Sequence, residues 1–417
     1  MHGGDVYRNR ISLDFSVNVN PMGMPEQVRE ALAEGCNLAE AYPDPKCEAL
    51  REALGKHFSW DPERILCGNG ASELIQAICR WRKPKTALLL APGFSGYQKA
   101  LRAEGCQWDS FFLKEEEGFG LSEASFQELK QTIREKKPEL IFLANPSNPV
   151  GWVMPREWMA ELAKVCEATG TILVIDECFM ELVEDPKAYS MTEIASDHSK
   201  QQMEEMVSDC SEPRAIAGYP KLMILRAFTK SFAMPGIRLG YLLCGSEIPV
   251  EALEEQLSEW NVSLPAQMAG VSALSILDGL AEDGNEEAGE ENWLAESRRV
   301  IAEERSYLEA ELKELGAYVY PSKVNYLLFR WEEDAPKHDL TQKDLPWGDA
   351  SKRDLPQKNF SWGDASKKST LYDALLAEGV LIRDCRDYDG LGAGYYRVAV
   401  KRHDDNIRLI ELMKKQK

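Results

Sequence analysis

A lysine near the middle of the chain follows a run of apolar residues. Lys230 comes shortly after Leu222–Leu225, and the polar residues 229–231 interrupt the pattern where a buried strand is expected to end. Burying a lysine there is costly unless its charge is paired or its amine is used covalently. A desolvated lysine has a lowered pKa, as Schiff-base chemistry requires. The alternative is an ordinary lysine that snorkels to the surface.

Two other charged residues stand at comparable places. Asp176 directly follows the apolar run 171–175, and Arg238 comes after Pro235 and Gly236, which bend the chain back toward Lys230. A carboxylate at the end of a buried strand needs a cation or caps the next turn. Asp176 therefore has two interpretations, a cap or a counter-ion that keeps a pyridine nitrogen protonated.

A glycine-rich turn supplies the remaining group. Residues 68–72 read Gly-Asn-Gly-Ala-Ser between an expected strand and an expected helix, so helix amides and the Ser72 hydroxyl form an anion cradle. The pattern lacks the lysine of a nucleoside triphosphate loop. Together with a strand-end carboxylate, a lysine and an arginine, this turn completes the parts that pyridoxal phosphate requires.

The elements that position these residues alternate between strands and helices from Asp61 onward. This alternation predicts an α/β fold in which a mostly parallel sheet lies between helices, with binding groups at the carboxyl ends of the strands. A smaller α/β C-terminal domain follows. Near the N-terminus, an amphipathic helix is predicted from Pro25 to Gly35.

At 417 residues the chain exceeds one typical core, so two domains are expected. We predict an N-terminal segment, residues 1–44, that packs with the small domain. Residues 45–262 form a large cofactor-binding domain with an insertion at about 196–221. Residues 263–417 form a small C-terminal domain with an insertion at about 333–369. The second insertion contains the hexapeptide WGDASK twice, from Trp347 and from Trp362. Such a repeat is typical of a surface insertion.

Composition limits the possible partners. The net charge of −20 disfavours nucleic acid and anionic membrane surfaces. The 10 cysteines include no CxxC pair, as expected for reduced thiols in the cytosol. No apolar run is long enough to span a bilayer, and the N-terminus has no signal-peptide core. We expect a cytoplasmic protein without a metal site.

Four motifs in order carry a family resemblance: NPSNPVG, IDECF, TKSFAMPGIRLGY and YYRVAV. They resemble the class I/II aminotransferases, a superfamily of fold type I pyridoxal phosphate enzymes, over nearly the whole chain apart from the insertions. Within this superfamily, LDFSVNVNPMG, GNGASE and YPSKVNYLLFR are most similar to threonine-phosphate decarboxylases of cobalamin biosynthesis. Histidinol-phosphate aminotransferases are next.

The resemblance implies pyridoxal phosphate-dependent decarboxylation of a phosphorylated amino acid. The substrate is L-threonine O-3-phosphate, giving (R)-1-aminopropan-2-ol O-2-phosphate, or L-serine O-phosphate, giving ethanolamine phosphate. The alternative is a histidinol-phosphate-type aminotransferase. A third hypothesis is a non-catalytic pyridoxal phosphate protein, which the presence of Lys230, Asp176 and Arg397 disfavours.

Cofactor contacts follow from the same motif positions. The resemblance implies that Lys230 forms a Schiff base, that Asp176 pairs with the pyridinium nitrogen, that Asn148 contacts the ring 3-oxygen, and that Phe94 stacks on the ring. The residues implied to hold the cofactor phosphate are Gly70, Ala71, Ser72, Thr229, Arg238 and, from the other subunit of a homodimer, Tyr42. Phe179 stands where many aminotransferases have a tyrosine that contacts the ring oxygen.

Substrate contacts are implied in the same way. Arg397 is expected to fork onto the α-carboxylate, a bidentate task suited to guanidinium. Arg383 is expected to meet the phosphate of the substrate, while His2 and Gly3 close over it and Asn148 contributes from the cofactor side.

Overall fold

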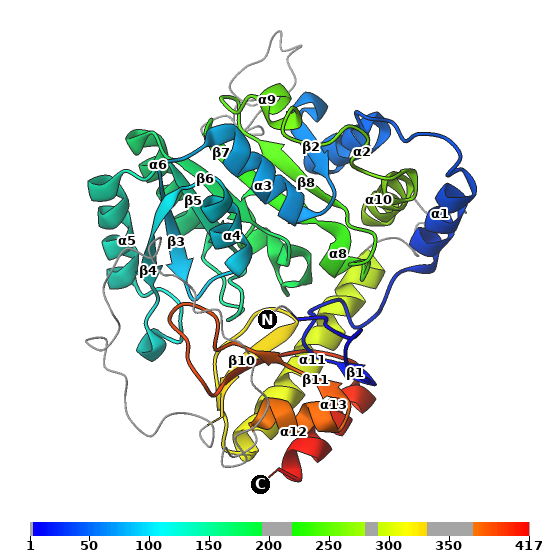
Figure 1. Ribbon diagram of the computed structural model, residues 1–417, viewed down its shortest axis with the longest axis vertical. Helices are drawn as coiled ribbons and strands as arrows, with labels where there is room; N and C mark the ends of the chain where they lie inside the picture. Colours follow the sequence, from blue (N-terminus) through cyan, green and yellow to red (C-terminus); the bar gives the residue numbers. More distant parts are fainter. Residues whose placement is uncertain (1–2, 194–218, 280–290, 332–369, 417) are drawn as a thin grey trace.

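The computed structural model describes residues 3–193, 219–279, 291–331 and 370–416 (Figure 1). A large body of helices around one sheet lies above a smaller body with a second sheet in this view. The insertion predicted at about 333–369, including both WGDASK repeats, lies outside the described residues, as does most of the insertion at about 196–221.

The central sheet of the large body has seven strands in the order β2-β8-β7-β6-β5-β3-β4. These strands are β2 (Ile65–Gly68), β3 (Thr86–Ala91), β4 (Gln107–Phe112), β5 (Leu140–Ala144), β6 (Ile172–Asp176), β7 (Leu222–Ala227) and β8 (Gly240–Cys244). Strand β8 runs antiparallel to both of its neighbours, whereas the other paired strands run parallel. The predicted mostly parallel sheet is therefore confirmed.

Both faces of this sheet are buried, which explains its continuous apolar runs. Successive side chains of a strand point to opposite faces. In β5, Ile141 and Leu143 accordingly enter one hydrophobic core, while Leu140 and Phe142 enter another on the opposite face.

The α-helices among the described residues are α1 (Glu26–Asn37), α2 (Glu48–Phe58), α3 (Ala71–Arg82), α4 (Ser95–Ala103), α5 (Glu123–Lys136), α6 (Arg156–Thr169), α8 (Phe228–Ser231), α9 (Val250–Glu254), α10 (Leu264–Leu277), α11 (Glu291–Glu314), α12 (Leu371–Ala377) and α13 (His403–Lys414).

The first helix extends beyond its predicted end. Helix α1 continues through Gly35 to Asn37. A Cβ added at Gly35 would lie 2.6 Å from the Cα of Pro265, so this glycine permits close packing of α1 on α10. Ser263 caps α10 by accepting a hydrogen bond from the N–H of Ala266. None of the described helices combines the length and the apolar character that crossing a bilayer demands.

The smaller body contains an antiparallel sheet in the order β12-β13-β10-β9. Its strands are β9 (Tyr318–Val319), β10 (Tyr326–Arg330), β12 (Arg383–Asp384) and β13 (Tyr395–Ala399), and a separate parallel pair joins β1 (Leu13–Asp14) to β11 (Val380–Leu381). Helices α11, α12 and α13 pack around these strands (Figure 1). The smaller C-terminal α/β unit is thus confirmed.

The predicted division of the chain at 44/45 and 262/263 stays a prediction. Phe15 packs in the core of the smaller body, whereas α1, in the same N-terminal segment, packs on α10. Helix α10 also packs on α2, although it follows the second predicted boundary.

Candidate active site

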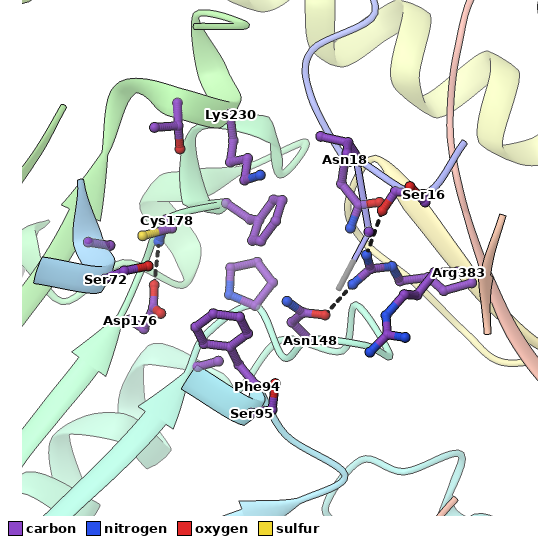
Figure 2. A pocket seen from close by; sticks show the side chains of 18 of the residues that line it. Ser16, Asn18, Ser72, Phe94, Ser95, Asn148, Asp176, Cys178, Lys230 and Arg383 are labelled. Atoms are coloured by element: carbon purple, nitrogen blue, oxygen red, sulfur yellow. Dashed lines mark hydrogen bonds between the residues drawn. The ribbon is translucent and has the colours of Figure 1, made fainter. Parts of the chain in front are cut away.

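A pocket of about 230 Å³ lies where the large sheet meets the smaller body and the N-terminal segment (Figure 2). Most of the residues singled out from the sequence line it: Gly3, Ala71, Ser72, Phe94, Asn148, Asp176, Thr229, Lys230, Arg238, Arg383 and Arg397. Gly70 adjoins Arg238 without lining the pocket, and Tyr42 lies outside it. His2 lies outside the described residues.

The apolar residues before Lys230 indicated that this lysine lies at the end of a strand. The structure places it beyond the strand. Strand β7 ends at Ala227, and Lys230 belongs to the short helix α8, where its carbonyl accepts a hydrogen bond from the N–H of Asn20 at 2.9 Å. Its ammonium nitrogen lies 5.7 Å from the centroid of the Phe179 ring. Within the described part of the chain it has no hydrogen-bond or ion-pair partner. Burial, followed by the nearby charge of Arg397, lowers the pKa of Lys230 to about 8.

The position of Asp176 is compatible with both of its interpretations, a cap of the following turn and a counter-ion in the pocket. One carboxylate oxygen accepts the backbone N–H of Cys178 at 3.0 Å, which caps the turn after β6. The other accepts the hydroxyl of Tyr97 at 2.7 Å, and the carboxylate lines the pocket. The Tyr97 ring stacks on Phe142 with centroids 4.9 Å apart, so its hydroxyl is held in place. Burial and the charge of Asp176 raise the pKa of Tyr97 well above its usual value.

The glycine turn and Arg238 form one side of the pocket. Gly70 has a φ of +79°, and a Cβ added there would lie 2.7 Å from Nη2 of Arg238. Glycine therefore permits the guanidinium to approach the start of α3. No side chain caps this helix, and Arg238 donates to the carbonyl of Pro235 at 3.0 Å. The arrangement presents helix amides and a cation to an anion.

Arg397 is buried on the opposite side, on β13, with 6% of its surface exposed. Its guanidinium donates to the side-chain oxygen of Asn148 and, at 3.0 Å, to the carbonyl of Ser16. Its Nε is buried and has no hydrogen-bond partner among the described residues. This unpaired N–H leaves capacity for an acceptor.

Arg383 lies directly across the β12–β13 pair from Arg397, so the two side chains share one face of the sheet. It is 5% exposed and donates to the carbonyl of Asp384 at 2.6 Å. Its other terminal nitrogen contacts both carboxylate oxygens of Asp387 at 2.8 and 3.0 Å. Figure 2 shows Arg383 on the side of the pocket away from Lys230.

Sequence reasoning missed part of the lining. Ser16, Asn18, Ser95, Tyr97, Cys178 and Tyr388 also line the pocket. The strongest missed signal was the polar series Ser16, Asn18 and Asn20, which alternates with apolar residues in the motif LDFSVNVNPMG. Asn20 donates to the carbonyl of Ser231 and to the hydroxyl of Ser297, both at 2.9 Å, and so fixes the segment beside Lys230.

Tyr42 lies on the surface, with 79% of the residue exposed. Its ring packs on Trp260 with centroids 4.7 Å apart. It therefore makes no contribution to the pocket of its own chain.

Comparison with known proteins identifies relatives over nearly the full length. The family model "Aminotransferase class I and II" matches residues 10–411. The threonine-phosphate decarboxylase of Salmonella typhimurium is 29% identical, covering 96% of this chain and 90% of that protein. A putative threonine-phosphate decarboxylase of Caldanaerobacter subterraneus subsp. tengcongensis is 31% identical, covering 99% and 93%. The solved histidinol-phosphate aminotransferase of Sinorhizobium meliloti in complex with pyridoxal-5'-phosphate shares the fold, with a TM-score of 0.70, 18% identity and coverage of 98% and 92%.

Proposed function

We propose, because the chain belongs to the aminotransferase class I and II family, that it is a pyridoxal phosphate-dependent decarboxylase of L-threonine O-3-phosphate. The similarity to threonine-phosphate decarboxylases along nearly the whole chain supports this reaction over transamination. It also supports a place in cobalamin biosynthesis.

The observation that carries the proposal is the pair of buried guanidinium groups, Arg383 and Arg397, on one wall of the pocket. A phosphorylated amino acid has two anionic ends, and each matches one of these cations. Arg397, which lines the pocket, binds the α-carboxylate. Arg383 binds the phosphate. L-serine O-phosphate presents the same two groups, and the missing methyl group is worth only about 1–3 kcal/mol in a pocket.

The residues of the pocket also fit pyridoxal phosphate. Gly70, with its positive φ, leaves room for Arg238 beside the uncapped start of α3, and this cradle, with Thr229 nearby, suits the cofactor phosphate. Phe94 offers a ring face, Asp176 a carboxylate for the pyridine nitrogen and Asn148 an amide for the 3-oxygen. Bound pyridoxal phosphate supplies an electron sink for the Cα bond that breaks.

The chemical role of Lys230 follows from its desolvated amine. With a pKa of about 8, part of the Lys230 amine is neutral near physiological pH, so its nitrogen would be able to hold the cofactor through the aldehyde of pyridoxal phosphate. In its protonated form it can return a proton to Cα after carbon dioxide has left. Arg397 and Arg383 fix the orientation of the Cα bonds by holding both ends of the substrate, and orientation decides between loss of carbon dioxide and loss of a proton.

We also propose that the protein forms a homodimer and lies in the cytoplasm. Tyr42 is exposed and outside the pocket of its own chain, as expected for a residue that reaches the cofactor phosphate of the other subunit. Sedimentation of the holoenzyme tests the dimer, and Tyr42→Phe should weaken cofactor retention in it. The described cysteines are all free thiols, in keeping with a reducing compartment.

The decisive experiment is product analysis with the purified, cofactor-loaded protein. L-threonine O-3-phosphate and L-serine O-phosphate are supplied separately without any 2-oxo acid. Carbon dioxide and a phosphorylated amino alcohol, both absent with Lys230→Ala, are the expected products, and the two rates rank the substrates. Amino transfer from histidinol phosphate to 2-oxoglutarate, without carbon dioxide, would instead establish the aminotransferase.

A further inference from the structure

Tyr326 lies behind the wall of the pocket. It belongs to β10, is fully buried and does not itself line the pocket. In the pairing of β10 with β13, Leu328 lies opposite Arg397. Side chains two positions apart on a strand point to the same face, so Tyr326 and Arg397 are diagonal neighbours on the face toward the pocket.

The ring of Tyr326 supports the guanidinium of Arg397. The central carbon of the guanidinium lies over this ring, 5.3 Å from its centroid. Such stacking is favourable, and more so where both groups are buried. The hydrogen bonds to Asn148 and to the carbonyl of Ser16 hold the edge of the guanidinium, whereas the ring of Tyr326 restricts its tilt. An arginine held in this way presents its N–H groups in a fixed plane.

The hydroxyl of Tyr326 anchors the loop that carries Asn148. It donates to the carbonyl of Ser147 at 2.8 Å, and this carbonyl is part of the planar peptide group that joins Ser147 to Asn148. The N–H of Gly151 donates to the same carbonyl at 2.7 Å. Burial raises the pKa of Tyr326 above its usual value, so the hydroxyl stays a donor at physiological pH. One side chain therefore contacts both Arg397 and the loop of Asn148.

A third contact of Tyr326 supports the wall beside Lys230. The rings of Tyr326 and Phe179 meet edge to face, with centroids 5.1 Å apart and planes at 74°. Phe179 lines the pocket, and its ring centroid lies 5.7 Å from Nζ of Lys230. Tyr326 thus packs behind two lining residues and holds the loop of a third.

We propose that Tyr326 is a positioning residue for the substrate, which holds Arg397 in the orientation that grips the α-carboxylate and keeps Asn148 aligned with it. This inference rests on the proposed function, because it takes Arg397 as the carboxylate ligand. Arg383, the proposed phosphate ligand, lies against a different ring, 5.1 Å from the centroid of Tyr388. Loss of Tyr326 therefore weakens binding of the carboxylate end of the substrate and spares the phosphate end.

The test compares Tyr326→Phe with Tyr326→Leu in the full-length, cofactor-loaded protein. Phenylalanine keeps the ring beside Arg397 and removes only the hydroxyl, whereas leucine removes both. Phe329→Leu is the matched control, since Phe329 lies on the same strand, is equally buried and packs in the core on the opposite face.

Calorimetry gives the Kd of two anions for each variant. The first is 3-phosphonooxypropanoate, which has the carboxylate and the phosphate of L-serine O-phosphate but lacks the amine, so its binding requires no chemistry at the cofactor. The second is inorganic phosphate, which has no carboxylate. The melting temperature of each variant is measured alongside.

We expect Tyr326→Leu to raise the Kd of 3-phosphonooxypropanoate about 10-fold to 30-fold, as for a lost cation–π contact between buried groups. Tyr326→Phe should raise it only about fivefold, as for one lost hydrogen bond. The Kd of inorganic phosphate should stay within about twofold of the wild type in both variants. In an Arg397→Gln background, Tyr326→Leu should have less than about a twofold effect, because the guanidinium that it positions is gone.

Phe329→Leu should lower the melting temperature and leave both Kd values unchanged. An unchanged Kd of 3-phosphonooxypropanoate in Tyr326→Leu would overturn the inference. An equal rise for both anions, or an equal rise in Phe329→Leu, would also overturn it, because Tyr326 would then act only through the stability of the fold. Tyr326→Met is the second variant without a ring, for use if Tyr326→Leu does not fold.

Neither Kd depends on turnover, so the two proposals fail separately. A wild-type protein that releases no carbon dioxide defeats the proposed reaction, while the two Kd values still decide the role of Tyr326. A wild-type protein that binds 3-phosphonooxypropanoate no more tightly than inorganic phosphate has no carboxylate ligand at Arg397, and this result overturns the inference about Tyr326.

Discussion

Two clusters of charged residues meet at the end of β6, and they differ in how their charges are paired. The closed cluster consists of Arg226, Glu177, Glu181 and Ser190. Arg226 and Glu177 are 4% and 1% exposed, and their side chains form an ion pair at 2.6 Å. The hydroxyl of Ser190 and the N–H of Met191 each donate to Glu177 at 2.8 Å.

The open cluster consists of Asp176, Lys230, Arg383 and Arg397 around the pocket. Asp176 and Glu177 are consecutive in the chain, yet each belongs to a different cluster. Burial favours a lower pKa at Arg226, but the charges of Glu177 and Glu181 outweigh it and raise this pKa. Burial lowers the pKa of Lys230 to about 8 without such compensation.

The difference in pairing indicates that the buried charges of the closed cluster stabilise the fold, whereas those of the open cluster bind ligands. In the closed cluster each charge has a protein partner, so the cluster stabilises one arrangement of β6 and β7. In the open cluster Lys230 and the Nε of Arg397 have no partner among the described residues, so ligands must provide what the protein does not. Changes in the open cluster should impair activity more than folding, and changes in the closed cluster the reverse.

The largest effect on activity is expected from Lys230→Met. Carbon dioxide release should fall by several orders of magnitude, because no other amine is placed to replace Lys230 within the described pocket. The apoenzyme should nevertheless be more stable than the wild type at pH 7, by about 3 kcal/mol, since a desolvated charge is replaced by an apolar chain of similar size. Denaturant unfolding of both apoenzymes measures this difference.

The same pair of proteins gives a pH signature. At pH 7 the amine of Lys230 is mainly protonated in both the folded and the unfolded state, so most of the desolvation cost is present. Between pH 8 and 10.5, the ordinary pKa of lysine, the unfolded state alone holds the proton, and the stability of the wild type rises. The advantage of Lys230→Met should therefore fade over this interval. A difference that stays constant with pH would contradict the desolvated lysine.

Glu177→Gln should have the largest effect on stability. It leaves the buried Arg226 with one of its two carboxylate partners, Glu181, and should cost up to about 3–5 kcal/mol, the range for a broken buried pair. The control is Glu303→Gln, which removes the surface pair with Arg299, whose side chains are 56% and 59% exposed, and should cost less than about 1 kcal/mol. Equal unfolding free energies for the two variants would show that the Glu177–Arg226 pair stabilises the fold no more than a surface pair does.

Arg397→Lys tests the open cluster with charge retained. Lysine cannot reproduce the planar fork that reaches Asn148 and the carbonyl of Ser16. The KM for the phosphorylated amino acid should rise about 30-fold or more, corresponding to about 2 kcal/mol or more for a damaged charged contact. Arg402→Lys, at an exposed arginine outside the pocket, is the control. If Arg397→Lys has the KM of the wild type but a lower melting temperature, Arg397 stabilises the fold and does not bind the substrate.

Much of this arrangement was predictable because strand ends carry strong local signals. Apolar runs followed by polar residues located Asp176 and the glycine turn at one edge of a mostly parallel sheet, where the pocket lies. The position of Lys230 was less well predicted. Helix α8 covers only Phe228–Ser231, and so short a helix leaves no periodic pattern.

The contacts that could not be predicted are those set by tertiary packing. Gly35 has the sequence signature of a helix end, but it is needed for the approach of Pro265. The ion pair between Arg383 and Asp387 has the spacing of a helical pair, yet it forms across a loop. The hydrogen bond from Tyr97 to Asp176 joins residues separated by 79 positions. Sequence spacing alone does not encode such distances.

The smallest predicted effect tests this last contact. Tyr97→Phe removes the hydroxyl that donates to Asp176 but keeps the ring that stacks on Phe142. Losing one hydrogen bond of about 1 kcal/mol should raise the Kd of pyridoxal phosphate about fivefold. The melting temperature of the apoenzyme should change little, because the apolar packing remains.

Cofactor release, followed by fluorescence, measures the effect of Tyr97→Phe, and Tyr189→Phe, which removes a hydroxyl outside the pocket, is the control. A loss of apoenzyme stability with unchanged cofactor affinity would show that the hydroxyl of Tyr97 completes the fold, as Ser190 does beside Glu177. In that case Asp176 would belong with the closed cluster. A lower affinity for the cofactor with unchanged stability of the apoenzyme would instead show that Asp176 serves cofactor binding, whereas the neighbouring Glu177 serves the fold.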